Sequence, residues 1–265
     1  MTRTVRATRR VAVPALAAAA LLAGSVAAWA QFVDGQGLFG RRRAPVVIED
    51  QVVPYDGKFA FVRLRYDTRF GRREPPWSHD YPRAERHFMR ILQEITFLRP
   101  HLDETNILGL GDPALFDYPV AYMSEPGYWT MTPEEAANFR AYLDKGGFVI
   151  FDDFRGQHWY NFEAQIRQLY PEGRLVALDV SHPIFHSFFE IVSLDFVQFY
   201  DRSETPIFYG LFEDNDPDKR LLLVANYNND IGEYWEFSDQ GYVPIDLSNE
   251  AYKLGVNYVI YAMTH

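Results

Sequence analysis

Two carboxylates follow the most apolar segment of the chain. Asp152 and Asp153 come directly after Phe148–Phe151, in which every residue is apolar. Paired carboxylates can carry out general acid–base catalysis or bind a hard cation through oxygen. Aspartate is also a favoured residue in helix caps and turns, so the same pair can simply hold the backbone. The spacing leaves both roles open.

Other polar segments also follow apolar runs. Ser124–Gly127 ends one run, Asn226–Glu236 follows another, and His182 comes after the β-rich segment Arg174–Asp179. Ligands of open α/β sheets bind beyond the carboxyl ends of the strands, so we expect these segments to meet around one cleft. Asn226–Glu236 either presents polar side chains to a ligand or forms an Asx-rich turn. The predicted ligand-binding residues are Glu125, Asp152, Asp153, His182, Asn228, Asp230 and Trp235.

Three more specific motifs are incomplete. Ser124 lacks the flanking glycines of a nucleophile elbow. His182 and His186 have the spacing of a helical metal pair, but the glutamate of a zinc protease is missing between them. Asp214–Asp218 resembles a calcium loop, yet lysine and alanine stand at two of the required positions, which favours a solvated turn. We therefore predict no metal site, and the catalytic residues and any cofactor stay unassigned.

A sheet must bring these segments together, and strands and helices alternate along the chain in the way such a sheet requires. Short loops between alternating strands and helices imply a mostly parallel sheet with helices on both faces. The sequence thus predicts a single three-layer α/β domain over residues 59–265. The predicted strands are 59–66, 106–108, 118–124, 148–151, 174–179, 206–212 and 220–226, and the predicted helices are 83–98, 132–146, 160–169 and 251–262.

The helix that begins at Thr132 has the clearest signals. Thr132 is a favoured N-cap, Pro133 fits the first helical position, and Glu135 completes a capping box. Gly146 stands where a helix commonly ends with a left-handed residue. This helix leads straight into the apolar segment before Asp152, so it fixes the start of that strand.

The N-terminal segment has the pattern of a signal peptide. Four arginines lie within residues 1–10, an alanine-rich apolar run follows, and Ala28–Ala30 fits a cleavage site. The alternative is an uncleaved anchor, since a membrane span needs roughly 20 apolar residues. We favour cleavage of residues 1–30 and export to the periplasm or outside the cell. Glycines and prolines punctuate residues 31–58, which we interpret as a linker.

The composition excludes several classes of function. The chain carries 36 acidic and 26 basic residues, and its net charge of −10 argues against nucleic acid and anionic membranes as partners. Signal cleavage removes four arginines and makes the charge more negative. The chain has no cysteine, so disulfides, thiolate metal sites and thiol nucleophiles are excluded.

Taken in order, several segments resemble a bacterial family known as domain of unknown function 4159. The resemblance covers nearly all of residues 59–265 and implies a fold like that of class I glutamine amidotransferases and flavodoxin. A cysteine can follow the paired aspartates in that family, whereas Phe154 stands there in this chain. Thiol-dependent amidase activity is therefore excluded. The matching segments are Phe61–Tyr66, Asp112–Pro119, Leu143–Phe148, Asp152–Asp153, His182–His186, Asn229–Asp230 with Gly232 and Trp235–Glu236, and Lys253–Asn257.

Three hypotheses for the function remain. The leading one is an exported, non-catalytic or degenerate domain that binds a polar ligand, a glycan or an envelope protein, at the carboxyl edge of the sheet. The rival is a metal- or carboxylate-dependent hydrolase of a polar envelope substrate. A third is a scaffold for an envelope complex, suggested by the arginines at 41–43 in the predicted linker. None of the three includes a membrane span after signal cleavage.

Overall fold

The computed structural model describes residues 53–68, 74–195 and 203–265. The predicted signal peptide and most of the predicted linker lie outside these residues. Val53 is already part of the domain, because it is buried and its N–H donates to the side-chain oxygen of Asn106. The packed chain therefore starts before Phe59, the expected first residue of the domain.

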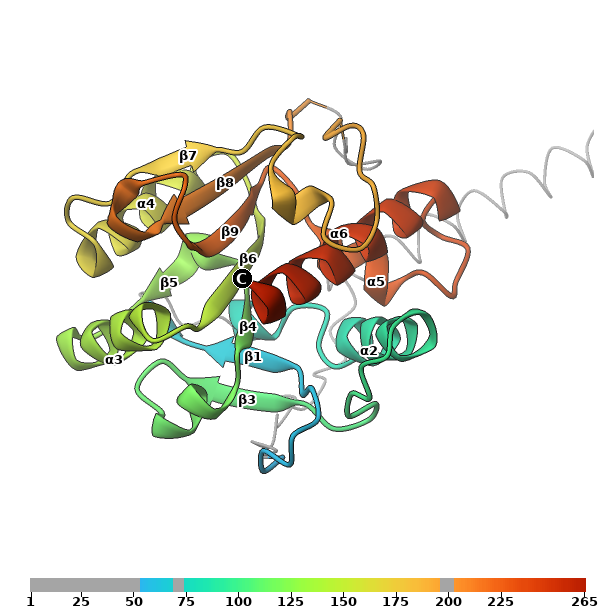
Figure 1. The fold of residues 1–265 in the computed structure, drawn as a ribbon, viewed down its shortest axis with the longest axis horizontal. Helices are drawn as coiled ribbons and strands as arrows, with labels where there is room; N and C mark the ends of the chain where they lie inside the picture. Colours follow the sequence, from blue (N-terminus) through green and yellow to red (C-terminus); the bar gives the residue numbers. More distant parts are fainter. Residues whose placement is uncertain (1–52, 69–73, 196–202) are drawn as a thin grey trace, which may run out of the picture. The chain divides into compact units, whose positions relative to one another are not determined.

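Seven strands form one sheet, and five adjacent strands of it are parallel (Figure 1). The antiparallel strand β8 follows them, paired to both of its neighbours, so the predicted mostly parallel sheet is confirmed. The order across the sheet is β3 (Asn106–Gly109), β1 (Val62–Arg65), β4 (Val120–Ser124), β6 (Phe148–Phe154), β9 (Leu221–Tyr227), β8 (Ile207–Phe212) and β7 (Leu175–Ala177). A separate pair of short strands is β2 (Asp67–Thr68) with β5 (Trp129–Thr130).

Helices cover both faces of the large sheet (Figure 1). Side chains alternate between the faces, so that Tyr122 joins the core under one helical layer and Met123 joins the core under the other. All seven residues of β6 are buried, as expected for a central strand covered on both sides. One layer contains α2 (Arg83–Ile95), α5 (Ile231–Glu236) and α6 (Ile245–Thr264), and the other contains α3 (Pro133–Asp144) and α4 (His158–Leu169).

Local signals in the sequence explain several boundaries. Thr132 caps α3 through the predicted capping box with Glu135. Gly146 ends that helix with φ of +116°, a conformation that favours glycine. The short 3-10 helices are η1 (Pro76–Ser78), η2 (Pro113–Asp117), η3 (Pro126–Tyr128), η4 (Pro183–Phe185) and η5 (Glu213–Asn215).

One segment differs from the expected structure. Residues 226–236 were expected to be a loop, but their second half is the helix α5. Asp230 caps this helix, because its Oδ1 accepts the N–H of Glu233 at 2.9 Å. Asp230 is therefore the N-terminal signal of this helix, and the asparagines before it made the segment resemble an Asx-rich turn.

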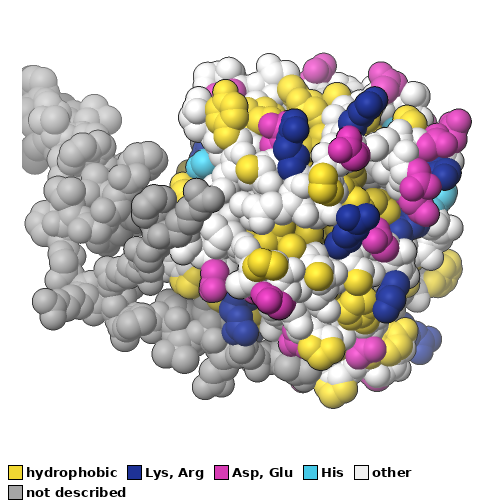
Figure 2. Space-filling model, turned by 90° about the vertical axis from the view of Figure 1, so that its left-hand side faces the viewer, with side chains coloured by type: hydrophobic (Ala, Val, Ile, Leu, Met, Phe, Trp, Pro, Cys, Tyr) yellow, Lys and Arg dark blue, Asp and Glu magenta, His cyan; other side chains and the backbone are white. Residues whose placement is uncertain are grey.

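The surface contains charges of both signs. On the face drawn in Figure 2, acidic and basic side chains are interspersed with single apolar ones. Within the described residues, no helix combines the length and the apolar character needed to cross a bilayer.

Candidate functional site

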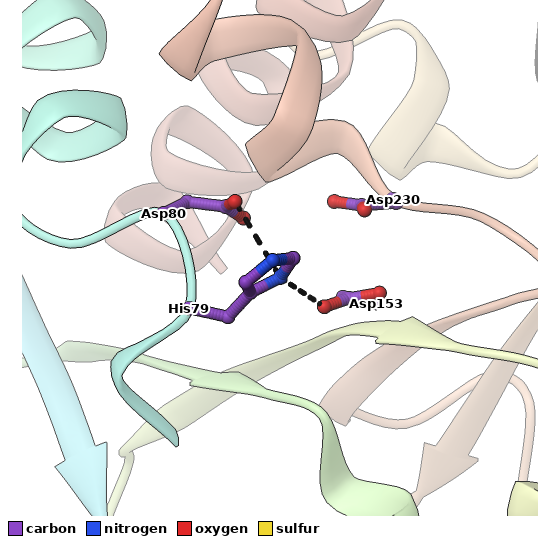
Figure 3. A group of neighbouring side chains, drawn as sticks. All are labelled: His79, Asp80, Asp153 and Asp230. Carbon is purple, nitrogen blue, oxygen red and sulfur yellow. Dashed lines mark hydrogen bonds and ion pairs between the residues drawn. The ribbon is translucent and has the colours of Figure 1, made fainter. Parts of the chain in front are cut away.

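Four side chains meet beyond the carboxyl ends of the central strands. His79, Asp80, Asp153 and Asp230 point toward one another from three separate segments (Figure 3). One nitrogen or oxygen atom from each lies within 4.8 Å of all the others. We call these four residues the carboxylate cluster. One histidine and three carboxylates within this distance match the ligand types of divalent cation sites.

A bulge in β6 places Asp153 in the carboxylate cluster. Phe151 and Phe154 of β6 pair with Ala225 and Tyr227 of β9, so β6 contains one extra residue over this stretch. Asp153 takes up the irregularity with φ of +57°, a region that aspartate tolerates better than most residues. The bulge sends the side chains of Asp152 and Asp153 to different surroundings. Asp152 is hydrogen-bonded in the core, whereas Asp153 faces His79.

A buried arginine holds the loop that carries His79 and Asp80. Arg63 of β1 donates from one guanidinium nitrogen to the carbonyl oxygens of Trp77 and His79, at 2.9 and 2.7 Å. Its charge is paired with Glu85 of α2, and both side chains are fully buried. A buried ion pair of this kind costs desolvation, but its geometry fixes the loop relative to strand and helix.

Asp230 connects the carboxylate cluster to a second acidic group. Its carboxylate caps α5, whose Glu233 and Glu236 lie three residues apart on one helix face. Asp80, Glu233 and Glu236 form a group whose carboxylate oxygens also lie within 4.8 Å of one another. Asp80 belongs to both groups. The edge of the sheet therefore gathers five carboxylates around one histidine.

Burial and mutual repulsion make these carboxylates hard to ionise together. Desolvation raises the pKa of Asp80 well above its usual value, and the charge of Asp153 adds to this effect against the opposing charge of His79. Desolvation also raises the pKa of Asp230, reinforced by the charges of Asp153 and Asp80. Burial likewise raises the pKa of Glu233 to about 7.

His79 partly offsets this repulsion. Its Nδ1 lies 2.8 Å from Asp153 Oδ2 and 3.5 Å from Asp80 Oδ1. Desolvation alone would lower the pKa of His79, but the hydrogen bond with Asp153 and the nearby negative charges outweigh it and raise the pKa to about 10. Burial would raise the pKa of Asp153, and the hydrogen bond from His79 outweighs it, so the pKa is lowered. The protonated imidazole of His79 is thus a single positive charge beside the carboxylates of Asp80, Asp153 and Asp230.

Asp80 is the least satisfied member of the carboxylate cluster. It is 5% exposed, and neither of its carboxylate oxygens accepts a hydrogen bond from any residue that the structure describes. Leaving a buried carboxylate without hydrogen-bond donors costs on the order of 1–3 kcal/mol or more. A cation bound between Asp80, Asp153 and Asp230 would remove that cost and replace the proton on His79.

The sequence matches one known family over most of its length. Residues 60–263 match the model of Domain of unknown function (DUF4159). The chain belongs to the DUF4159 family. A search of curated proteins gave no match. The family name carries no activity, so the chemistry of this DUF4159 domain is argued from its own residues.

Two of the predicted ligand-binding residues, Asp153 and Asp230, lie in the carboxylate cluster, and Glu125 lies beside it. The backbone N–H of Glu125 donates to the carbonyl oxygen of Asp152 at 3.1 Å. The negative charge of Glu125 is near enough to contribute to the raised pKa of His79. The carboxyl ends of β4, β6 and β9 are therefore neighbours in the DUF4159 domain, as expected for parallel strands.

Asp152, Asn228 and Trp235 have structural surroundings instead. Asp152 is buried and accepts three hydrogen bonds. Asn228 has φ of +57°, accepts the N–H of Gly156, and donates to the carbonyl oxygen of Thr205. The Trp235 ring is 1% exposed and stacks on Phe88 with centroids 4.4 Å apart. None of these three side chains faces the carboxylate cluster.

His182 lies at the opposite edge of the sheet. Its ring is 5.7 Å from that of Phe212, which pairs with Leu221, the first residue of β9. Its Nδ1 accepts the N–H of Ile184 at 3.2 Å, so it caps η4. The expectation that His182 joins the other residues is not met, because the chain after β7 folds back toward the amino ends of the parallel strands.

Four residues of the site were not predicted from the sequence. His79 and Asp80 lie in a long polar loop after the first strand. The rule that ligands bind beyond the carboxyl ends of strands was applied to the other segments and would also have indicated this loop. Glu233 and Glu236 were hidden because α5 was expected to be a loop. The helical spacing of these two glutamates was the available signal.

Proposed function

We propose that the carboxyl edge of this DUF4159 domain binds a divalent cation through His79, Asp80, Asp153 and Asp230, and that the cation holds a polar, oxygen-rich ligand of the cell envelope. The proposal keeps the expected binding of a polar ligand at this edge. It differs from the sequence-based prediction, which included no metal site, because a cation now binds the ligand.

The observation that carries this proposal is that the buried carboxylate of Asp80 accepts no hydrogen bond from the described residues and has only a 3.5 Å ion pair with His79. A buried carboxylate needs either donors or a cation nearby, and its neighbours in the carboxylate cluster are mainly further carboxylates. Three carboxylates and one imidazole suit Mn²⁺ or Zn²⁺, and carboxylate-rich sites also suit Mg²⁺. The side chain of His79 is 47% exposed, so the site is open to solvent on that side.

Hydrolysis of a polar envelope substrate is the second candidate function. Its support is the position of Glu233, which is half-buried and has a carboxylate oxygen within 4.8 Å of one from Asp80. A bound cation can lower the pKa of a water molecule, and a neighbouring carboxylate can accept its proton. Glu233 would be that base.

We also propose that the domain has a flavodoxin-like or glutamine amidotransferase-like fold and works outside the cytoplasm. In chain order, the five parallel strands β1, β3, β4, β6 and β9 are arranged 2-1-3-4-5, which is the flavodoxin order and supports the first part. The N-terminal pattern of arginines, an apolar run and an Ala-x-Ala site supports export to the periplasm or outside the cell.

Titration with Mn²⁺ tests the cation site directly. Calorimetry should show binding by the wild-type protein, and at 100 times the Kd the cation should stabilise the fold by about 2.7 kcal/mol. The double variant Asp153→Asn/Asp230→Asn should lose both effects. Asp117→Asn changes an exposed aspartate on η2 and should keep them.

Two outcomes would contradict the cation site: no binding by the wild type, or equal binding by the double variant. The hydrolase candidate needs a further measurement. Ester and glycoside substrates should turn over only with Mn²⁺ present, and Glu233→Gln should abolish turnover while keeping the Mn²⁺ that is bound by His79, Asp80, Asp153 and Asp230. Turnover that resists a chelator would exclude a cation-dependent mechanism of hydrolysis.

A further inference from the structure

Asp80 has two carboxylate oxygens that face different neighbours. Oδ1 lies 3.5 Å from Nδ1 of His79, on the side of the carboxylate cluster. Oδ2 lies beside Gly232 at the start of α5, 2.7 Å from the point where a side chain there would begin. Asp80 belongs to both groups of metal-ligand side chains, and a carboxylate in that position can bridge two cations with one oxygen on each.

The second group has ligands of its own. Glu233 and Glu236 extend from α5 and are half-buried, whereas the carboxylates of the first group are buried. Oxygen atoms of Asp80, Glu233 and Glu236 lie within 4.8 Å of one another, which is a distance that one cation can close. Hydrogen bonds do not explain the orientation of Asp80, because its oxygens accept none from the described residues.

We propose that Asp80 bridges two divalent cations, one held by His79, Asp153 and Asp230 and the other by Glu233 and Glu236. This inference rests on the proposed cation site and extends it to a pair. Metal pairs in proteins are about 3.5–4 Å apart and clamp two oxygens of one anionic group. The ligand class that fits is a phosphoryl group on a small molecule or sugar.

The charge of the site supports this ligand class. Without cations, the carboxylates at this edge repel an anion, and the positive charges of His79, Arg63 and Arg155 oppose them only in part. Two divalent cations add four positive charges, which offset most of the charge of the five carboxylates. A phosphoryl group is then repelled far less and can place one oxygen on each cation, so its tight binding requires both cations.

Metal content and electron paramagnetic resonance of the Mn²⁺-loaded protein distinguish the outcomes. Two Mn²⁺ per chain with a spin-coupled spectrum are expected, and Glu236→Gln should retain one uncoupled Mn²⁺. Glu163→Gln makes the same change on α4, where Glu163 pairs with Arg167, and should behave like the wild type. Circular dichroism verifies that each variant is folded.

The results separate this inference from the proposed function. One uncoupled Mn²⁺ in the wild type, or two ions without coupling, overturns the bridged pair and leaves the single cation site standing. No bound Mn²⁺ overturns both. Inorganic phosphate is the probe for the ligand class: it should bind the Mn²⁺-loaded wild type at least 10-fold more tightly than loaded Glu236→Gln. Equal affinity for the two proteins overturns the phosphoryl assignment.

Discussion

Two buried aspartates at the same edge of the sheet have opposite surroundings. Asp152 accepts hydrogen bonds from Tyr122 Oη at 2.8 Å, Asn226 Nδ2 at 2.9 Å and the backbone of Gly232 at 3.0 Å. Asp80 also lies near Gly232, but its carboxylate accepts no hydrogen bond from the described residues. Both residues are buried aspartates, so they differ in the number of hydrogen-bond donors around the carboxylate.

The difference indicates which carboxylate serves the fold and which serves the site. The network around Asp152 continues from Asn226 to Tyr258, whose hydroxyl donates to the amide oxygen at 2.9 Å. Each carboxylate and amide oxygen in it accepts a hydrogen bond, so it ties β4, β6, β9 and α6 together. Asp80 has only its ion pair with His79 to offset the cost of its burial. The two aspartates therefore predict opposite responses to the same substitution.

The largest effect is expected for Asp152→Asn. An amide at this position directs its NH₂ group either at the donor Asn226 or at the donors Tyr122 and Gly232, and leaves them without an acceptor. Urea denaturation should show a loss of about 2 kcal/mol in unfolding free energy. The adjacent change Asp153→Asn is the matched control and should cost less, about 1 kcal/mol, because its amide oxygen can still accept the hydrogen bond from His79. Equal losses would remove the distinction between the two positions.

Asp80→Asn should act in the opposite direction. Without cations it removes a repelling charge, so the unfolding free energy in the presence of a chelator should rise by about 1 kcal/mol. Its affinity for Mn²⁺ should fall by about 100-fold, because the variant loses an ionised ligand. Thermal unfolding with and without Mn²⁺ measures both. A less stable variant in chelator would mean that the Asp80 carboxylate supports the fold.

The pH dependence of stability sharpens the comparison further. The pKa is raised to about 7 for Glu233 and to about 10 for His79, so the native state holds more protons than the unfolded state between their ordinary and raised values. Their contribution to the free energy of unfolding is therefore full at low pH and is lost as the pH rises through the raised pKa values. Melting temperatures in chelator should therefore fall from pH 5 to pH 9.

Saturating Mn²⁺ provides the control for that pH series, because the cation competes with the protons for the same side chains. The fall with pH should become shallower or reverse when Mn²⁺ is present. A pH profile that is identical with and without Mn²⁺ would show that the titrating groups are not the cation ligands.

The smallest effect is expected for His182→Ala. This histidine caps η4 at the far edge of the sheet, and its Nδ1 accepts one backbone N–H. Loss of the cap should cost about 1 kcal/mol, and the affinity for Mn²⁺ should not change. A 10-fold weaker affinity measured by calorimetry would place His182 in the site after all.

The fold was largely predictable because its signals are local. The capping box at Thr132, the glycine at 146 and the apolar run of β6 each depend on a few adjacent residues. The parallel sheet then follows from the alternation of strands and helices. The short helix α5 was missed because its cap resembles a turn and tertiary contacts, not length, stabilise it.

The candidate site was only half predictable because its members are brought together by contacts between distant segments. Asp153 and Asp230 follow strands and satisfied the strand-end rule. His79 and Asp80 lie in the same site because Arg63 holds their loop there through hydrogen bonds to Trp77 and His79. No local sequence pattern predicts these long-range hydrogen bonds. His182 satisfied the rule and lies elsewhere, since the rule assumes that the chain continues past the edge after each strand.

Arg63 gives the site an order of assembly. It joins the first parallel strand to α2 through Glu85 and also grips the carbonyls beside His79, so the metal-binding loop has its shape only once strand and helix have docked. An unfolded chain lacks this arrangement, so the proposed cation site forms only after the strand and the helix have packed together. Binding of a cation would then follow folding and could not guide its first steps.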